Sequence, residues 1–391
     1  MKRAAFLFGS GISLPSGAPG VCEITDAILN RGWRNDGNDN DPRFSQNGTE
    51  SSGEAKRAQE FLRILKNYID PHLRRRENRG SHYEDIYAAA VQILQDEMCE
   101  IVNPMLCGSV CDIKNLAAAL YQGRNKDDLP RPFTDQFTFL VYIAHLLISW
   151  GVLDVLWPIE TPKGLETLTS CAKGTDQMDI FSLNHDMLIE QQLKQNEIPF
   201  SDGFSDKRGD VLRFNWSWKN EKRVRLYKLH GSLDWYPFAF PENEHQSKRD
   251  FAKVSREVKP DKCKDSKGTN LELLNPLPLF LAGTVTKDRL YGIGFLRELF
   301  CQFHASLNEH QTLICCGYGW KDKGINNAVT QWLGTSNENR IVILQNNGSP
   351  DKLKQSQYWS THWNRQGHKV VVFPKWFSEC TLNDLQPFFD K

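Results

Sequence analysis

Residues 4–20 read AAFLFGSGISLPSGAPG, an apolar run that stops at a glycine-rich loop. The run Ala4–Phe8 has no polar residue on either face, which is typical of a strand buried inside a parallel sheet. Gly9–Gly11 follows directly, and a helix is expected from about Val21, where apolar residues recur at helical spacing. The stretch therefore predicts a strand, a tight loop and a helix in succession.

The same pattern recurs later in the chain. Short apolar runs that predict strands lie at residues 179–183, 224–229, 312–316, 340–344 and 369–373. Most of them end in glycine, asparagine or histidine, and helical patterns lie between several of them. Strands that alternate with helices predict an α/β fold, here a Rossmann-like open and mostly parallel sheet with a helical insertion domain. Such a sheet binds its ligand at the carboxyl ends of the strands.

The length of 391 residues, at about 150 per domain, favours either one large domain with an insertion or two domains. Residues 31–54 are polar and without period, so a surface loop is expected there, and helical stripes follow over 55–157. We therefore predict a Rossmann-like domain from 1–30 and 158–391, with 31–157 as a polar loop and helical insertion domain. A second surface excursion is expected over the charged residues 241–272.

The composition excludes several classes of protein. Lys+Arg and Asp+Glu each number 48, so the formal net charge is zero, which argues against direct nucleic-acid binding. It also leaves copies of the chain with little mutual repulsion, which is compatible with a homo-oligomer. The ten cysteines include no CxxC pair, so we expect no zinc and no other metal.

The location is expected to be cytoplasmic, because the apolar run at the start stops too early for an export signal. The apolar segment Phe137–Leu153 has His145 near its middle and is at the short edge of the membrane-spanning range. We predict a buried helix there and no membrane association.

Polar or glycine residues follow four of the predicted strands. The four segments are Gly9–Gly11, Asn184–Asp186, His230–Gly231 and Gly317–Gly319. Because carboxyl ends of parallel strands lie at one edge of the sheet, these segments are expected to converge. The first segment lacks the third glycine of the usual dinucleotide fingerprint, so by itself it is either a phosphate-binding loop or a plain tight turn.

The four segments together resemble the sirtuin (silent information regulator) family. The resembling stretches are FGSGISLPSGAPG (Phe8–Gly20), SLNHD (Ser182–Asp186), KLHGSLDW (Lys228–Trp235) and CGYGWKDKGIN (Cys316–Asn326). The first three are similar to the family's GAGxS…GxP loop, its T-Q-N-x-D motif and its histidine-glycine strand end. The fourth is similar to a segment of the bacterial sirtuin-like subfamily. The resemblance covers 4–30 and 179–346 in pieces and omits the helical insertion.

The sequence also departs from the sirtuin deacylases. Gly20–Cys22 stands where they have Asp-Phe-Arg, Leu183 replaces the glutamine of T-Q-N-x-D, and their four-cysteine zinc module has no counterpart after His230. The resemblance therefore implies the bacterial subfamily, which cleaves its substrate NAD to nicotinamide and ADP-ribose in anti-phage defence. A HerA-type ATPase is the partner implied for a stand-alone chain.

The resemblance implies catalytic roles for Asn184, Asp186 and His230. Asp186 would accept from the carboxamide of nicotinamide, and Asn184 would orient the attacking water or a ribose hydroxyl. His230 is the candidate base, since histidine accepts a proton near neutral pH. The residues expected to bind NAD are Gly9, Ser10, Gly11, Ser13, Pro19, Gly317, Tyr318, Gly319 and Gln345.

Two other functions stay open at this point, an NAD-dependent protein deacylase and a non-catalytic scaffold that binds NAD or ADP-ribose and regulates a partner. Individual residues also have simpler interpretations, because Asn and His at strand ends often only form turns. His185 is expected to cap the following helix rather than to contact ribose, and Asp234 and Trp235 are expected to stiffen the loop after His230.

Overall fold

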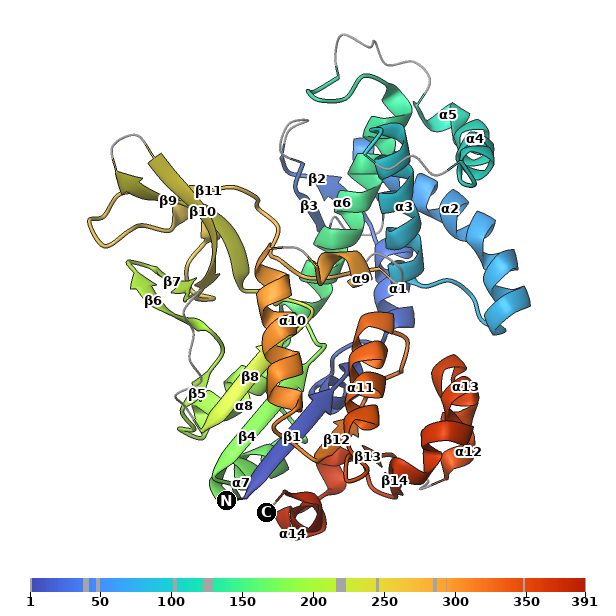
Figure 1. Ribbon diagram of the computed structural model, residues 1–391. Coiled ribbons are helices and arrows are strands. Elements are labelled where there is room, and N and C mark those ends of the chain that lie inside the picture. Colours follow the sequence, from blue (N-terminus) through green and yellow to red (C-terminus); the bar gives the residue numbers. More distant parts are fainter. Residues whose placement is uncertain are drawn as a thin grey trace. The chain divides into compact units, whose positions relative to one another are not determined.

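A computed structural model describes residues 2–37, 42–46, 50–100, 104–121, 129–215, 223–243, 246–283, 287–292, 294–346 and 349–390. The chain forms two compact units, whose elements are labelled in Figure 1. The first unit comprises Met1–Ala18, Ile159–Leu281 and Lys287–Lys391, and the second comprises Pro19–Pro158 and Ala282–Thr286.

A seven-stranded sheet forms the centre of the first unit, in the order β14-β13-β12-β1-β4-β8-β5. The strands are β1 (Arg3–Phe8), β4 (Gln177–Ser182), β5 (Phe200–Ser201), β8 (Val224–Lys228), β12 (Thr312–Cys316), β13 (Arg340–Leu344) and β14 (Val370–Phe373). Each neighbouring pair is parallel. The predicted Rossmann-like α/β fold is confirmed.

The strand order reverses beside β1. From β1 the chain proceeds outward through β4 and β8, and it later returns on the other side of β1 through β12, β13 and β14. Open α/β sheets bind ligands at such a reversal, outside the carboxyl ends of the strands. Phe8 pairs with both Cys316 and Ser182, and Ser182 pairs with Lys228, so four strands end side by side.

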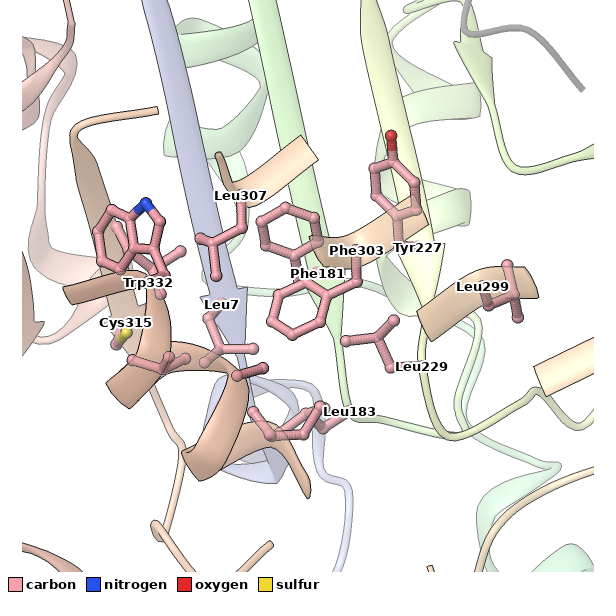
Figure 2. Packing of buried hydrophobic residues seen from close by; sticks show 14 of the residues in the cluster. Leu7, Phe181, Leu183, Tyr227, Leu229, Leu299, Phe303, Leu307, Cys315 and Trp332 are labelled. Atoms are coloured by element: carbon pink, nitrogen blue, oxygen red, sulfur yellow. The ribbon is translucent and has the colours of Figure 1, made fainter. Parts of the chain in front are cut away.

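Helices cover the sheet through two hydrophobic clusters. The helices of this unit are α7 (Glu166–Gly174), α8 (Leu188–Gln195), α9 (Lys287–Leu290), α10 (Gly294–Leu307), α11 (Lys323–Thr335), α12 (Pro350–Lys354), α13 (Gln357–Gln366) and α14 (Leu382–Leu385). Alternate residues of β1 enter different clusters, as the period of a strand requires. Figure 2 shows one cluster, where Leu7 and Phe181 from the strands meet Phe303 and Leu307 from α10.

A buried ionic cluster lies at the amino end of the same sheet. His310 contacts Asp179 through Nε2 at 2.7 Å and Asp390 through Nδ1 at 3.2 Å. Arg225 also pairs with Asp179. Burial alone would lower the pKa of His310, but the two carboxylates outweigh it and raise that pKa above its ordinary value.

A second, antiparallel sheet corrects the prediction of a surface excursion over 241–272. Its order is β11-β9-β10-β7-β6, with β6 (Phe204–Arg208), β7 (Val211–Phe214), β9 (Trp235–Asn243), β10 (Gln246–Val254) and β11 (Glu272–Leu273). The charged residues of β10 led to the prediction of a surface segment, but two of them are buried in ion pairs. Asp250 accepts from Arg213 at 2.9 Å, and Lys253 donates to Asp202 at 2.6 Å.

The second unit is mainly helical. Its elements are α1 (Val21–Asn30), β2 (Trp33–Asn35), β3 (Phe44–Gln46), α2 (Gly53–Glu77), α3 (Tyr83–Glu97), α4 (Cys107–Leu116), α5 (Ala118–Tyr121) and α6 (Gln136–Leu156). Within the described part of the chain, only α6 is long and apolar enough to cross a membrane by length and composition. It packs against α1, α2 and α3, as expected for a buried helix.

Two boundaries differ from the sequence prediction. The division falls after Ala18 rather than after residue 30, because α1 packs with α2, α3 and α6. The predicted loop over 31–54 is wrong for β2 and β3, which pair with each other and bury Trp33 and Phe44. The two strands pack against α2 and α6, and their buried aromatic rings contribute to that packing.

Candidate functional site

The four predicted segments follow four neighbouring strands, β12, β1, β4 and β8. All of these strands are parallel, so their carboxyl ends lie at one edge of the sheet. The Gly317 loop and the Gly9 loop flank the strand-order reversal, and the Asn184 and His230 loops follow on one side.

The two glycine loops pack backbone against backbone. Gly9 N donates to Cys316 O at 3.0 Å, and Gly11 N donates to Gly317 O at 3.1 Å. A Cβ on Gly11 would lie 2.6 Å from Gly317 Cα, and Gly317 itself has a φ of +69°. These glycines are therefore needed for the contact between the loops, and the N–H of Gly11 is already used there.

Ser13 joins two of the predicted catalytic residues. Its hydroxyl donates to Asp186 Oδ2 at 2.7 Å and accepts from Asn184 Nδ2 at 2.9 Å. Asp186 Oδ1 accepts from Leu188 N at 3.1 Å, which fixes the carboxylate at the start of α8. All three side chains of this Ser13–Asn184–Asp186 cluster are buried.

The amide of Asn184 is held in one orientation by this arrangement. Because Nδ2 donates to Ser13, the carbonyl oxygen Oδ1 points away from Ser13. Oδ1 is buried and has no hydrogen-bond partner among the residues that the structure describes. A buried acceptor without a donor is costly, and a polar group of a bound ligand or a water would satisfy it.

His230 is paired with an aspartate that the sequence analysis missed. His230 Nε2 lies 2.9 Å from Asp322 Oδ2, and the Tyr291 hydroxyl donates to the same oxygen at 2.8 Å. Asp322 Oδ1 accepts from Ile325 N at 3.0 Å and so caps α11. Both His230 and Asp322 are buried.

Asp322 is a carboxylate at neutral pH. Burial would raise its pKa, but the hydrogen bond and the charge of His230 outweigh burial and hold the pKa well below the usual range. In the neutral form of His230, the carboxylate at Nε2 holds the proton on Nε2, so Nδ1 is the nitrogen that can accept a further proton.

A signal for Asp322 was present in the sequence. It lies within the CGYGWKDKGIN stretch and directly precedes a helix, where aspartate is a common N-cap. An aspartate at this position is already explained by helix capping, which needs no role in a functional site. The contact of Asp322 with His230 could therefore not be inferred from the sequence. Tyr291 carried no signal.

His185 does not cap α8, which corrects the expectation above. The Leu188 amide bonds instead to Asp186. The His185 ring is buried 5.1 Å from the ring of Phe280 and 6.2 Å from that of His230, measured between centroids. Burial, and then the positive charges of nearby His230 and lysines, hold the pKa of His185 well below its ordinary value, so this ring is neutral.

The remaining predicted residues lie in varied surroundings. The Tyr318 hydroxyl lies 3.1 Å from Asp322 O and 2.8 Å from Asn326 Oδ1 and can donate its one proton to either acceptor, so it braces the turn before α11. Gln345 Nε2 donates to Ser349 O at 2.5 Å. Ser10 and Gly319 are exposed, Pro19 belongs to the second unit, and Asp234 and Trp235 are buried after His230.

Residues 179–365 match the family model of the SIR2-like domain. This match supports a sirtuin-like family. It includes the loops of Asn184, His230 and Gly317, whereas the Gly9–Ser13 loop precedes the matched residues. SIR2-like domains are associated with NAD-dependent activity. No curated protein matches the chain.

No group of three or more His, Cys, Asp or Glu side chains that could hold a metal ion occurs in the described ranges. The hydrogen-bonded groups of the site are instead an amide, two carboxylates, an imidazole and two hydroxyls. Such a set can orient a polar substrate and transfer a proton.

Proposed function

We propose that this protein is an NAD glycohydrolase, which cleaves its substrate NAD to nicotinamide and ADP-ribose. The observation that carries the proposal is the buried, unpartnered Oδ1 of Asn184, whose direction is set by Ser13. The next strand of the sheet ends at His230, a base candidate that is itself oriented by a carboxylate.

The proposed reaction needs no strong general acid. The bond between the ribose carbon and the nicotinamide nitrogen breaks, and its electron pair leaves with nicotinamide, which is a cationic leaving group in NAD. Positive charge develops on the ribose, as in glycoside hydrolysis. The oxygen of water bonds to the ribose carbon, and the water loses one proton.

Asn184 Oδ1 is suited to accept a hydrogen bond from that water or from a ribose hydroxyl. His230 would take the proton at Nδ1, since Nε2 faces Asp322. Asp186 has accepted one hydrogen bond at each oxygen, and a carboxylate has further lone pairs for the carboxamide of nicotinamide. Asp322 and Ser13 are positioning residues in this scheme.

The NAD-binding roles of the other residues are part of the same proposal. The loops at Gly9–Ser13 and Gly317–Gly319 flank the reversal of strand order, which is where open α/β sheets bind nucleotides. Gln345 follows β13 on the same edge. Pro19 is included from the resemblance alone.

The biological setting is proposed from the resemblance to the bacterial sirtuin-like subfamily. We propose that the protein depletes NAD in the cytoplasm during anti-phage defence, as a homo-oligomer and with a HerA-type ATPase as its partner. No nucleic acid, membrane or metal is required by the proposed reaction.

The test is release of nicotinamide from NAD by the purified full chain, with and without a HerA-type ATPase. We expect release without any acylated peptide, and losses of about 10²–10⁴-fold in Asn184→Ala and His230→Ala. Asn196→Ala, which changes an exposed asparagine after α8, is the matched control and should be unaffected.

Three outcomes would contradict the proposal. Full turnover by either site variant would remove its assigned role. A strict requirement for an acylated lysine peptide would make the protein a deacylase. Tight binding of NAD or ADP-ribose without turnover, under each of these conditions, would make it a regulatory scaffold.

A further inference from the structure

Lys228, the last residue of β8, ends at the main chain of the Asn184 loop. Its side chain is only 1% exposed. The ammonium group donates to the main-chain oxygen of Asp186 and, at 3.4 Å, to that of His185. One buried cation therefore joins two successive carbonyl groups between Asn184 and α8.

These carbonyls lie in a segment that has no regular secondary structure of its own. Residues 183–187 connect β4 to α8, so their main-chain oxygens depend on donors from other segments. Leu233 N also donates to His185 O, at 3.1 Å. A methionine would fill the volume of Lys228 without the cost of burying a charge, so the ammonium is explained by what it binds.

A chain of charges offsets the burial of this cation. Lys228 Nζ lies 3.3 Å from Glu190 Oε1, on α8. Lys253 Nζ lies 3.9 Å from the same oxygen and 2.6 Å from Asp202 Oδ2. Because Lys253 belongs to β10, the loop is connected through these side chains to the antiparallel sheet.

The position of the two carbonyls decides where the catalytic side chains point. His185 lies between Asn184 and Asp186, and both of these side chains bond to Ser13, at 2.9 and 2.7 Å. A rotation of the main chain at 185–186 would therefore move both contacts at once. Lys228 holds the part of the loop where such a rotation would occur.

We infer that Lys228 is a positioning residue of the proposed NAD cleavage, which clamps the carbonyls of His185 and Asp186 and thereby orients Asn184. This inference rests on the proposed function. It assigns Lys228 no contact with NAD, so its loss should lower kcat far more than it changes KM.

The test compares Lys228→Met with Lys369→Met in the full chain. Lys369 is the matched control, because its ammonium also joins two main-chain carbonyls, Leu333 O and Ser336 O, each at 2.6 Å. It precedes β14 and so lies at the amino end of the sheet. Lys228→Arg retains a cation and Glu190→Gln retains the lysine, so both should be milder.

Two measurements are made on each folded variant. Hydrogen exchange followed by mass spectrometry should show faster exchange at 183–188 in Lys228→Met and not in Lys369→Met. Nicotinamide release should show kcat lowered by about 100-fold, the usual cost of a small misplacement, with KM within about threefold. Lys228→Arg, which is expected to fold, should show the same effects to a smaller extent.

Exchange at 183–188 that is unchanged in both Lys228 variants would overturn the inference, as would a kcat equal to wild type in Lys228→Met. A wild-type chain that releases no nicotinamide would instead contradict the proposed function. The exchange experiment needs no substrate, so it still decides whether Lys228 clamps the loop.

Discussion

Asp322→Asn is the sharpest perturbation that the site offers, because it removes a charge and preserves the shape. The carboxylate of Asp322 accepts from three donors, His230 Nε2, the Tyr291 hydroxyl and Ile325 N. Asparagine has one acceptor oxygen. If that oxygen caps α11, the amide NH2 faces the two remaining donors, so the pair with His230 is lost.

The magnitude follows from these contacts. A hydrogen bond to a charged group contributes about 1.5–3 kcal/mol, so losing two costs about 3 kcal/mol of unfolding free energy at the lower limit. Asparagine is as good an N-cap as aspartate, so the helix start itself should be retained. For activity, a base that is no longer oriented loses the usual 10²–10⁴-fold rate gain of general-base catalysis, which is about 2.7–5.4 kcal/mol of activation free energy.

The assay is kcat for nicotinamide release at saturating NAD, beside thermal unfolding of the same preparations. Asp135→Asn is the control, because Asp135 caps α6 through Thr138 N in the same way but belongs to the second unit. Tyr291→Phe removes one donor and keeps the pair of His230 with Asp322, so its loss of activity should be smaller. A folded Asp322→Asn protein with wild-type kcat would refute the reasoning.

Ser13→Ala should slow the proposed NAD cleavage by at least about tenfold, because it removes a hydrogen bond of about 1.5 kcal/mol that orients the amide of Asn184. The rate of nicotinamide release measures this effect, and an unchanged rate would contradict the role assigned to Ser13. Gly11→Ala should lower stability by about 1–3 kcal/mol through its clash with the facing loop, whereas Gly319→Ala, with open space around it, should be neutral in thermal unfolding. The raised pKa of His310 means that its contribution to stability is complete below about pH 6.5 and is lost as the pH rises through the folded-state pKa. Urea unfolding between pH 5.5 and 8.5 should therefore show falling stability that His310→Ala flattens and exposed His368→Ala does not; parallel curves would count against this interpretation.

Most of the central sheet could be predicted because its inner strands are buried on both faces. In β1, the residues after Arg3 are all apolar up to the glycine that ends the strand, and an amphipathic helix does not have this pattern. The antiparallel sheet could not be predicted in the same way. In β10, Asp250 and Lys253 are buried only because Arg213 and Asp202 neutralise them, and those partners come from other segments.

In the candidate site, too, some residues could be predicted from the local sequence and others could not. Asn184 and His230 could be proposed because polar residues directly after buried strands lie at the ligand-binding edge of a parallel sheet. Asp322 could not, because an aspartate before a helix is sufficiently explained by capping. His185 was assigned as a cap from its local position, and the structure instead buries it between two rings.

The sequence by itself determined the class of fold, six of the seven strands of the central sheet (all but the two-residue β5), and the turn residues that end most of them. These properties are local, because an apolar run and the residue that ends it are neighbours in the sequence. Only the tertiary structure decided which polar atoms meet: Ser13 with Asn184, His230 with Asp322, and Lys228 with two carbonyls. Such contacts join residues far apart in the chain, and their partners follow from strand order, which no local pattern encodes.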